Sequence, residues 1–407
     1  MKLKMPYGIS NFEELITEDY YYVDKTRYIE KLESLPEKRI MFLRPRKFGK
    51  TLFTSVIENY YDKNRVDKFE KLFKNTYIGK NPTKLKNSYC ILRFNFSGID
   101  TSTEEATIRG FKNEVASSIE VFIHRYNLDF YVNTEDDAEN ILNNLFKAFY
   151  TQQPQEKIYV IIDEYDHFAN ELLGFHPERF KSLVSKNGKV RKWYEILKKG
   201  TETAVDRIFI TGVAPIILDS LTSGFNIGTD ITQDEDFNDM MGFTQSELIE
   251  ILNSQDIAKE EQEKILPIMK ENYDGYKFCL KAKNQIYNSN MCLFFLSRYI
   301  RLGDIPDNLI DMNIASDYSK IGKMLDLCRG EKRLEILQKT VKGEPISSNI
   351  VEKFNPAIEF SEIDMISMLY YLGYLTISGE NFGTPELTIP NKVMKEIYAS
   401  YFMQLMD

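Results

Sequence analysis

Four short apolar runs in the first half of the chain constrain its fold more than any other feature. They are RIMFL (39–43), SYCILRFNF (88–96), KIYVIIDEYD (157–166) and DRIFITGVA (206–214). Continuous apolar strands separated by helical stretches are typical of a parallel sheet with helices on both faces. Helical patterns fill the intervals at 51–62, 108–127 and 192–205. The first half therefore predicts a three-layer α/β core.

A chain of 407 residues is too long for one ordinary hydrophobic core, so we expect more than one domain. The sequence pattern also changes after about residue 230. From GFTQSELIEIL, where Thr244 and Glu247 have the spacing of a capping box, the chain reads as helices with polar connectors. The last segment reads as helix, hairpin of short strands and final helix. We expect a core at 1–230, a helical lid at 231–330 and a winged-helix-like C-terminal domain at 331–407.

The stretch FLRPRKFGKT (42–51) ends like a phosphate-binding loop, G-x-x-x-x-G-K-[ST], but has Arg44 in place of the first glycine. A Gly-Lys-Thr triplet also occurs by chance. Its position between an apolar strand and a helix favours a phosphate site, because free backbone N–H groups there point at an anion. We expect Lys50 to reach the β- and γ-phosphates and Thr51 to bind Mg²⁺. The loss of the glycine costs the turn some conformational freedom. We expect three cations to compensate by attracting the negative charge of a triphosphate: Arg44, Arg46 and Lys47. The remaining loop residues expected around the nucleotide are Pro45, Phe48, Gly49 and Leu52.

Acidic residues follow the apolar run Ile158 to Ile162. A P-loop enzyme needs an acid at a neighbouring strand end to hold Mg²⁺, and Asp163 suits this role. Glu164 suits a general base that polarises the attacking water. Taken alone, the two acids could equally be a solvated strand end. The run at 88–96 lies between the two motifs in sequence, as expected for P-loop ATPases with an additional strand and a catalytic Glu.

Thr211 ends the fourth run, where such ATPases keep a polar residue that senses the γ-phosphate. A threonine that simply bonds backbone is the equal alternative.

In order along nearly the whole chain, these motifs resemble the bacterial AAA-ATPase-like family, whose members often continue into a PD-(D/E)XK-type nuclease domain. The matching stretches are MPYGISNFEELITEDYYYVDKTRYIEKL (5–32), FLRPRKFGKTLF, VIIDEYD, FITGVAPI, MMGFTQSELIEIL, YDGYKF (273–278) and IYN (286–288). The resemblance implies a P-loop ATPase core, a helical lid and a winged-helix-like region. No segment after residue 390 has room for a nuclease core, so nuclease activity is not expected.

The resemblance also extends to residues outside the two main motifs. The leading segment YYVDKT (21–26) is expected near the nucleotide, with Tyr22 or Asp24 touching base or ribose. From the residues alone, Asp24 could instead cap a helix. Lys277 of YDGYKF could lie over the phosphates, or the motif could be a packed aromatic turn. Arg207 and Arg329 are candidates for an arginine finger from a neighbouring subunit.

These features predict a Mg²⁺-dependent ATPase that acts as a conformational switch or defence-type effector. The alternative is a nucleotide-gated protein- or nucleic-acid-binding module with little or no hydrolysis. Preference for ATP rests on the resemblance, since no guanine-reading N-K-x-D motif is present. Partners are expected to be other copies of the chain or a protein that binds the lid and C-terminal region.

Composition limits other classes of function. A net charge of −9 argues against a surface that binds nucleic acid throughout, although a basic stretch at 70–89 is either a solvated face or a local contact to phosphate backbone. Four separated cysteines fit a reducing cytoplasm, and three separated histidines, of which only His167 is near the expected site, argue against a metal cluster. No signal-like segment or long apolar run is present, so we expect a cytoplasmic protein without a membrane anchor.

Overall fold

The four apolar runs form one parallel sheet in the computed structural model, which describes residues 3–169, 172, 188–216, 228–311, 331–354 and 361–406. A short fifth strand is added at one edge. The strands are β1 (Arg39–Leu43), β2 (Cys90–Asn95), β3 (Ile158–Asp163), β4 (Val205–Gly212) and β5 (Thr229–Asp230). All six residues of β3 are buried, as expected for a strand covered on both faces. The predicted α/β class with a parallel sheet is confirmed.

The strand order is β2-β3-β4-β1-β5. The run at 88–96, expected to be the additional strand, forms β2 at the sheet edge beyond β3. The strand that separates β1 from β3 is β4, because β4 pairs with both. Since the strands are parallel, the carboxyl ends of β1, β3 and β4 meet at one edge, which is where open α/β sheets bind ligands.

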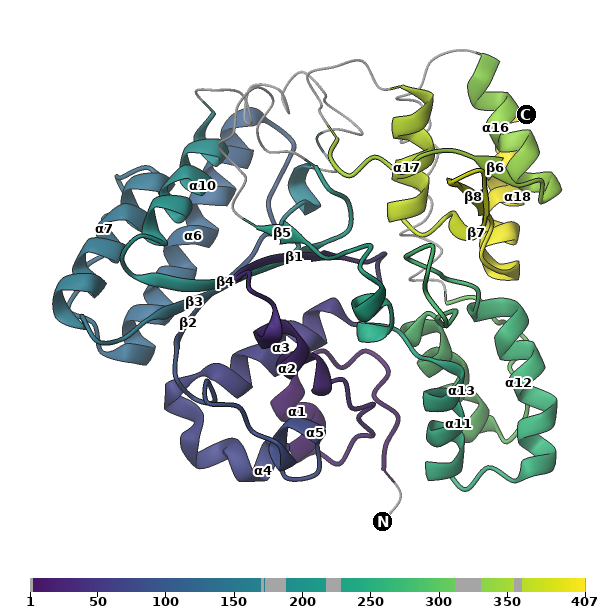
Figure 1. Cartoon of the computed structure of the whole chain (residues 1–407), viewed down its shortest axis with the longest axis horizontal. Helices are drawn as coiled ribbons and strands as arrows, with labels where there is room; N and C mark the ends of the chain where they lie inside the picture. Colours follow the sequence, from purple (N-terminus) through teal and green to yellow (C-terminus); the bar gives the residue numbers. More distant parts are fainter. Residues whose placement is uncertain are drawn as a thin grey trace.

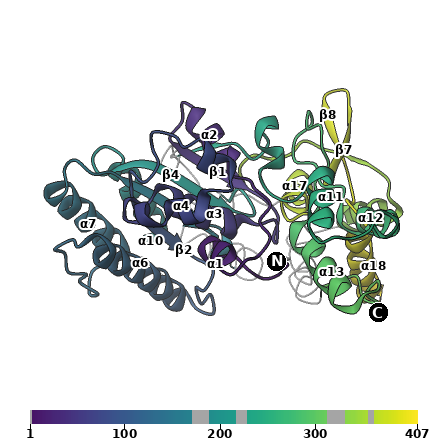
Figure 2. The same ribbon diagram turned by 90° about the horizontal axis from the view of Figure 1, so that it is seen from below.

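Helices cover both faces of this sheet (Figures 1 and 2). On one face α3 packs against β2 and β3, accompanied by the short helices of the N-terminal region. On the other face α6, α7 and α10 pack together, and Trp193 of α10 meets Phe94 of β2 edge-on with ring centroids 5.0 Å apart. The helices are α1 (Phe12–Thr17), α2 (Arg27–Ser34), α3 (Lys50–Tyr61), η1 (Lys63–Lys68), α4 (Phe69–Phe73), α5 (Tyr77–Lys80), α6 (Glu104–Tyr126), α7 (Ala138–Gln152) and α10 (Lys189–Gly200).

After β5 the described chain is mainly helical as far as residue 302, apart from the turns and isolated β-bridges of residues 274–288. The elements are η3 (Glu235–Met240), α11 (Gln245–Ser254), α12 (Lys259–Tyr273) and α13 (Ser289–Leu302). The capping box predicted at Thr244 and Glu247 is confirmed at the start of α11, with both reciprocal hydrogen bonds present. In Figure 2 the N-terminus lies at the junction between these helices and the sheet.

The C-terminal region is a small unit of helices around a three-stranded antiparallel sheet, in the order β6-β8-β7. It comprises α16 (Glu331–Lys342), β6 (Ile346–Ser347), α17 (Glu362–Tyr371), β7 (Thr376–Asn381), β8 (Thr384–Thr388) and α18 (Lys392–Met406). Figure 1 shows this unit beside α11, α12 and α13, on the side of the molecule away from α6 and α7. The division of the chain at residues 230 and 330 stays a prediction.

Among the described helices, none combines the length and apolar character needed to cross a bilayer. Arg329, one of the two finger candidates, lies outside the described residues.

Candidate nucleotide site

The loop between β1 and α3 carries the Gly-Lys-Thr triplet to a helix N-terminus. Gly49 precedes the helix with a φ of 96°, and Lys47 has a φ of 69°. Both angles lie in the left-handed region that glycine adopts readily. Arg44 is not among the residues with positive φ, so its position does not require glycine. This removes the cost that the missing first glycine was expected to impose.

Lys50 is buried at the start of α3. Its ammonium donates hydrogen bonds to the carbonyl oxygens of Arg44 at 3.0 Å and Pro45 at 3.1 Å. The nearer carboxylate oxygen of Glu164 lies 4.0 Å from the same nitrogen. The lysine is therefore held across the loop, between backbone oxygens on one side and an acid on the other.

Asp163 ends β3 and is fully buried. One carboxylate oxygen lies 3.4 Å from the Arg93 guanidinium and 3.5 Å from the Thr54 hydroxyl, both long for hydrogen bonds. The other oxygen has no hydrogen-bond partner among the described residues. Burial and the neighbouring Glu164 raise the pKa of Asp163 above its ordinary value, while Arg93 and Lys50 oppose the rise. This carboxylate therefore keeps one oxygen that is free to accept a further donor or a cation.

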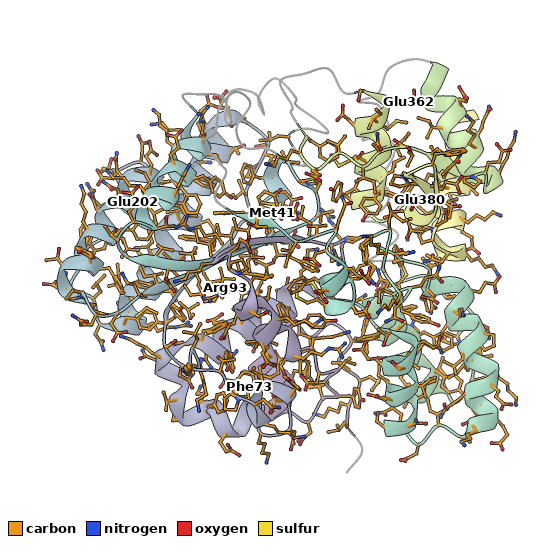
Figure 3. The ribbon with its side chains drawn as sticks, in the orientation of Figure 1. Met41, Phe73, Arg93, Glu202, Glu362 and Glu380 are labelled. Atoms are coloured by element: carbon orange, nitrogen blue, oxygen red, sulfur yellow. The ribbon has the colours of Figure 1, made fainter. Side chains whose placement is uncertain are left out.

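Arg93 comes from the adjacent strand β2 and lies between the sheet and α3 (Figure 3). Besides Asp163 it donates to Glu58 at 3.0 Å and to the Thr54 hydroxyl at 3.0 Å, both on α3. It therefore fixes Asp163 relative to the helix that carries Lys50 and Thr51. Arg93 was not among the predicted site residues, although an arginine in an otherwise apolar strand was the available signal.

Glu164 is held in a strained turn directly after the strand, with a φ of 53°. The turn is fixed by the next residues. The Tyr165 hydroxyl donates to the carbonyl of Ala214 at 2.6 Å, and Asp166 accepts hydrogen bonds from the amides of Val213 and Ala214. Asp166, the last acid of DEYD, thus joins the ends of β3 and β4 and fixes the turn that carries Glu164.

A basic pair lies beside Glu164. A guanidinium nitrogen of Arg46 is 3.5 Å from the imidazole Nδ1 of His167, and that nitrogen is 4.0 Å from the second carboxylate oxygen of Glu164. His167, which sequence analysis placed only near the site, thus connects the loop to the acid.

Lys50, Glu164, Arg46 and His167 line one cavity of about 510 Å³, whereas the buried Asp163 and its partner Arg93 are not among the residues of its wall. That volume is within the range of about 300–1,000 Å³ typical of small-molecule sites. The loop and acid residues on the wall are Arg46, Lys47, Phe48, Gly49, Lys50, Thr51, Leu52, Phe53, Glu164 and His167. The N-terminal segment contributes Leu15, Tyr22, Val23 and Lys25. The connection between η3 and α11 contributes Met241 and Phe243, and α13 contributes Ser289, Asn290 and Leu293. The cavity therefore has a polar end at the loop and largely apolar walls elsewhere.

Lys25 is a wall residue that sequence analysis did not single out. Its buried ammonium donates to both carboxylate oxygens of Glu247 at 2.7 Å and to the carbonyl of Asp239 at 2.9 Å. Burial lowers the pKa of Lys25, and the Glu247 carboxylate opposes that change. The pair ties the N-terminal segment to the first turn of α11.

Arg44 corrects one expectation. Its guanidinium does not line the cavity; it is buried, 1% exposed, and donates to the carbonyls of Leu43 and Thr232 at 2.8 Å and of Phe237 at 3.0 Å. Because the guanidinium is buried and hydrogen-bonded to backbone carbonyls, it cannot contact a triphosphate in the cavity. Pro45 is likewise buried and away from the cavity wall.

Two further expectations are corrected by hydrogen bonding. The Thr211 hydroxyl donates to the carbonyl of Phe42 at 2.8 Å, so it bonds backbone instead of facing the cavity. Asp24 accepts from the amide of Thr26 at 2.8 Å and from the amide of Tyr77 at 2.6 Å, which makes it a local turn and capping residue. Tyr22, its neighbour, does line the cavity.

Two basic candidates also lie elsewhere. Lys277 is absent from the cavity wall, and its motif is a packed aromatic turn in which Tyr276 and Phe278 both meet Phe48 edge-on. Arg207 is 7% exposed near the amino end of β4, opposite the edge that carries the acids. Its position does not suit an arginine finger.

Comparison with known proteins agrees with this geometry. Residues 6–222, more than half of the chain, match the family described as Predicted AAA-ATPase. A curated relative, described as an uncharacterized protein in the vnfD 5′ region of Azotobacter chroococcum mcd 1, is 25% identical over 301 residues. The alignment covers 73% of this chain and 53% of that protein, so the chain spans about half the length of that relative. The chain belongs to the AAA-ATPase-like family.

Proposed function

We propose that the protein binds ATP with Mg²⁺ and hydrolyses it at this cavity. The observation that carries the proposal is the convergence of Lys50 and Thr51, at the N-terminus of α3, with Asp163 and Glu164, at the end of β3. A helix N-terminus presents free N–H groups and a positive dipole to phosphate. Membership of a family of predicted ATPases supports the same chemistry.

The residues present fit a magnesium–triphosphate group. The unpaired oxygen of Asp163 and the Thr51 hydroxyl are the oxygen donors that Mg²⁺ prefers. When bound, Mg²⁺ supplies neutralisation of phosphate charge. Lys50 would exchange its two carbonyl partners for phosphate oxygens, and the guanidinium of Arg46 lies on the cavity wall to add a second positive charge.

Glu164 is the residue we assign to activation of water. Its carboxylate is 19% exposed on the cavity side and is held by a turn that β4 fixes. Proton transfer by a positioned carboxylate contributes about 10²- to 10⁴-fold to a rate. The aromatic and aliphatic wall formed by Tyr22, Val23 and Met241 is suited to a purine base, which accounts for the apolar part of the cavity.

The output we propose is a conformational switch or a defence-type effector that acts on a protein partner or on further copies of the chain. This step rests on family membership and not on the site. The C-terminal unit has the order of helices and hairpin found in winged-helix domains, which supports a binding role for it. Nucleic acid is a weaker candidate for that role because the chain is acidic.

The test is Mg²⁺-dependent ATP binding and turnover, measured over a range of protein concentrations. Lys50→Ala is expected to abolish tight ATP binding, and Glu164→Gln is expected to bind ATP while losing turnover. Lys38→Ala is a matched control, since Lys38 forms an exposed ion pair with Asp206 at the opposite end of the sheet. Binding that survives Lys50→Ala would sink the assignment of the site. Turnover that is unchanged in Glu164→Gln would favour a nucleotide-gated module that barely hydrolyses.

A further inference from the structure

Arg44, which replaces the first glycine of the phosphate-loop consensus, contacts three parts of the chain, and we call this set of contacts the joint. The Arg44 guanidinium lies between two rings, with its central carbon 4.1 Å from the Phe42 centroid and 4.1 Å from the Phe278 centroid. Its nitrogens reach the carbonyls of Thr232 and Phe237, nearly 200 residues along the chain. One side chain thus joins the end of β1 to η3 and to the segment after α12.

The rest of the loop is held by the same region. We define residues 276–278 as the aromatic strap. The Phe48 ring meets Tyr276 and Phe278 of the strap with centroids 4.9 and 5.4 Å apart. The carbonyl of Phe48 also accepts from the amide of Gly242 at 3.0 Å. Because Phe48 packs on the strap, a displacement of the loop would also displace the strap.

The strap is bonded in turn to the C-terminal unit. The Tyr370 hydroxyl donates to the carbonyl of Phe278 at 2.8 Å, and the Thr376 hydroxyl oxygen accepts from the amide of Lys277 at 2.7 Å. The turn between these residues touches the loop itself. Gly373 has a φ of +82°, and a Cβ there would lie 2.8 Å from the Pro45 ring. Only glycine fits both the angle and the space.

ATP binding would disturb this joint at the hydrogen bonds between the Lys50 ammonium and the loop carbonyls. The two carbonyls that hold Lys50 belong to Arg44 and Pro45, whose side chains are the ones packed against the strap and Gly373. Phosphate oxygens compete for the same ammonium protons. A ligand changes a conformational equilibrium when it interacts differently with the two states, and the exchange of Lys50 partners is such a difference.

We propose that Arg44 is a positioning residue that transmits nucleotide occupancy from the loop, through the aromatic strap, to the C-terminal unit. The inference rests on the ATP binding proposed above and adds the route of its regulation. It also gives a role to the YDGYKF motif, which the catalytic site leaves unused: the motif carries the strap.

The experiment is hydrogen exchange measured by mass spectrometry on the full chain, with and without Mg²⁺ and a non-hydrolysable ATP analogue. Coupling between sites typically amounts to about 5- to 150-fold in an equilibrium constant. We therefore expect exchange in the segment 369–378 of the wild type to change by about fivefold or more. Exchange in α7, on the far face of the sheet, is expected to stay unchanged.

The test variant is Tyr370→Phe/Thr376→Val, which removes the side-chain hydrogen bonds to the strap at nearly constant volume and leaves the long backbone bond from Ile377 to Lys277 at 3.5 Å. Its matched control is Tyr398→Phe/Thr340→Val in the same unit. Thr340 bonds only its own helix in the described hydrogen bonds, and the buried Tyr398 hydroxyl has no hydrogen-bond partner among the described residues. Arg44→Lys is a second test, because an ammonium cannot reproduce the planar fork that reaches separated carbonyls.

The outcomes separate the two proposals. Loss of the remote response in Tyr370→Phe/Thr376→Val and in Arg44→Lys, with the response kept in the control, supports the joint. A full response in both test variants overturns it. Saturable binding to the wild type without any change at 369–378 also overturns the joint but leaves the ATP site intact. Absence of nucleotide binding to the wild type overturns the proposed function, and the inference with it.

Discussion

Arg44→Gly would complete the phosphate-loop consensus, yet we expect it to destabilise the protein. Three carbonyls within 3.0 Å of the guanidinium, those of Leu43, Thr232 and Phe237, would lose a charged donor. Hydrogen bonds to a charged group contribute about 1.5–3 kcal/mol each. Against this, burial lowers the pKa of Arg44 to about 10 from 12.5. The group stays charged at neutral pH, and this shift corresponds to a desolvation cost of about 3 kcal/mol.

The balance is a loss of about 1.5 to 6 kcal/mol in the free energy of unfolding, which overlaps the range of mutations that break a buried polar network. The assay is urea unfolding at neutral pH, followed by circular dichroism and by fluorescence of Trp193, which is fully buried and is the one tryptophan of the sequence. Coincidence of the two transitions would establish two-state behaviour, which the free energy requires.

Lys47→Gly is the matched control from the same loop. Lys47 is exposed and has a φ of 69°, so glycine should fit its backbone better than lysine does. We expect no loss of stability there, or a small gain. If Arg44→Gly were as stable as the wild type to within about 1 kcal/mol, the buried role argued for Arg44 would be wrong.

Three further substitutions test other contacts. Gly373→Ala should lower stability by about 1–2 kcal/mol from the left-handed φ alone, and further because its Cβ would crowd Pro45; an unchanged thermal midpoint would contradict this. Glu247→Gln leaves the buried Lys25 ammonium without its carboxylate and should cost about 3 kcal/mol in urea unfolding, much of which Lys25→Met in the same chain should restore; no recovery would show that the charge is not the cause. Thr211→Val should leave ATP turnover unchanged and cost about 1 kcal/mol of stability, because its hydroxyl bonds only backbone; a large fall in turnover would restore a sensing role.

The sequence predicted the layers of the core well because their signals are local. Continuous apolar runs specify buried parallel strands, and the spacing of Thr244 and Glu247 specifies the start of α11. The Gly-Lys-Thr triplet and the acids after β3 were found because each sits at the end of such a run.

The errors have a common physical cause, which is that each depends on partners distant in sequence. Nothing local distinguishes a surface arginine from Arg44, whose hydrogen-bond partners lie near residue 235. The ligand role of Asp24 came from the family resemblance, and its hydrogen bond from the amide of Tyr77, 53 residues away, has no local signal. The order of strands likewise depends on pairing, so the sequence did not show that β4, and not the run at 88–96, separates β1 from β3 in the sheet. The signal for Arg93 was present as a charge within an apolar run.

The cavity wall described above also bears on how the protein is made. Its contributors run from Pro6 to Leu293, so a chain still under synthesis has the loop and both acids long before it has the opposite wall. Translation adds about 5 to 20 residues per second, so that wall appears some seconds after the acids have been made. A nascent or truncated chain lacking α13 would offer phosphate contacts without enclosure. Tight retention of nucleotide would thus mark a chain whose synthesis has passed residue 293, and the ligand would add its binding energy only to completed molecules.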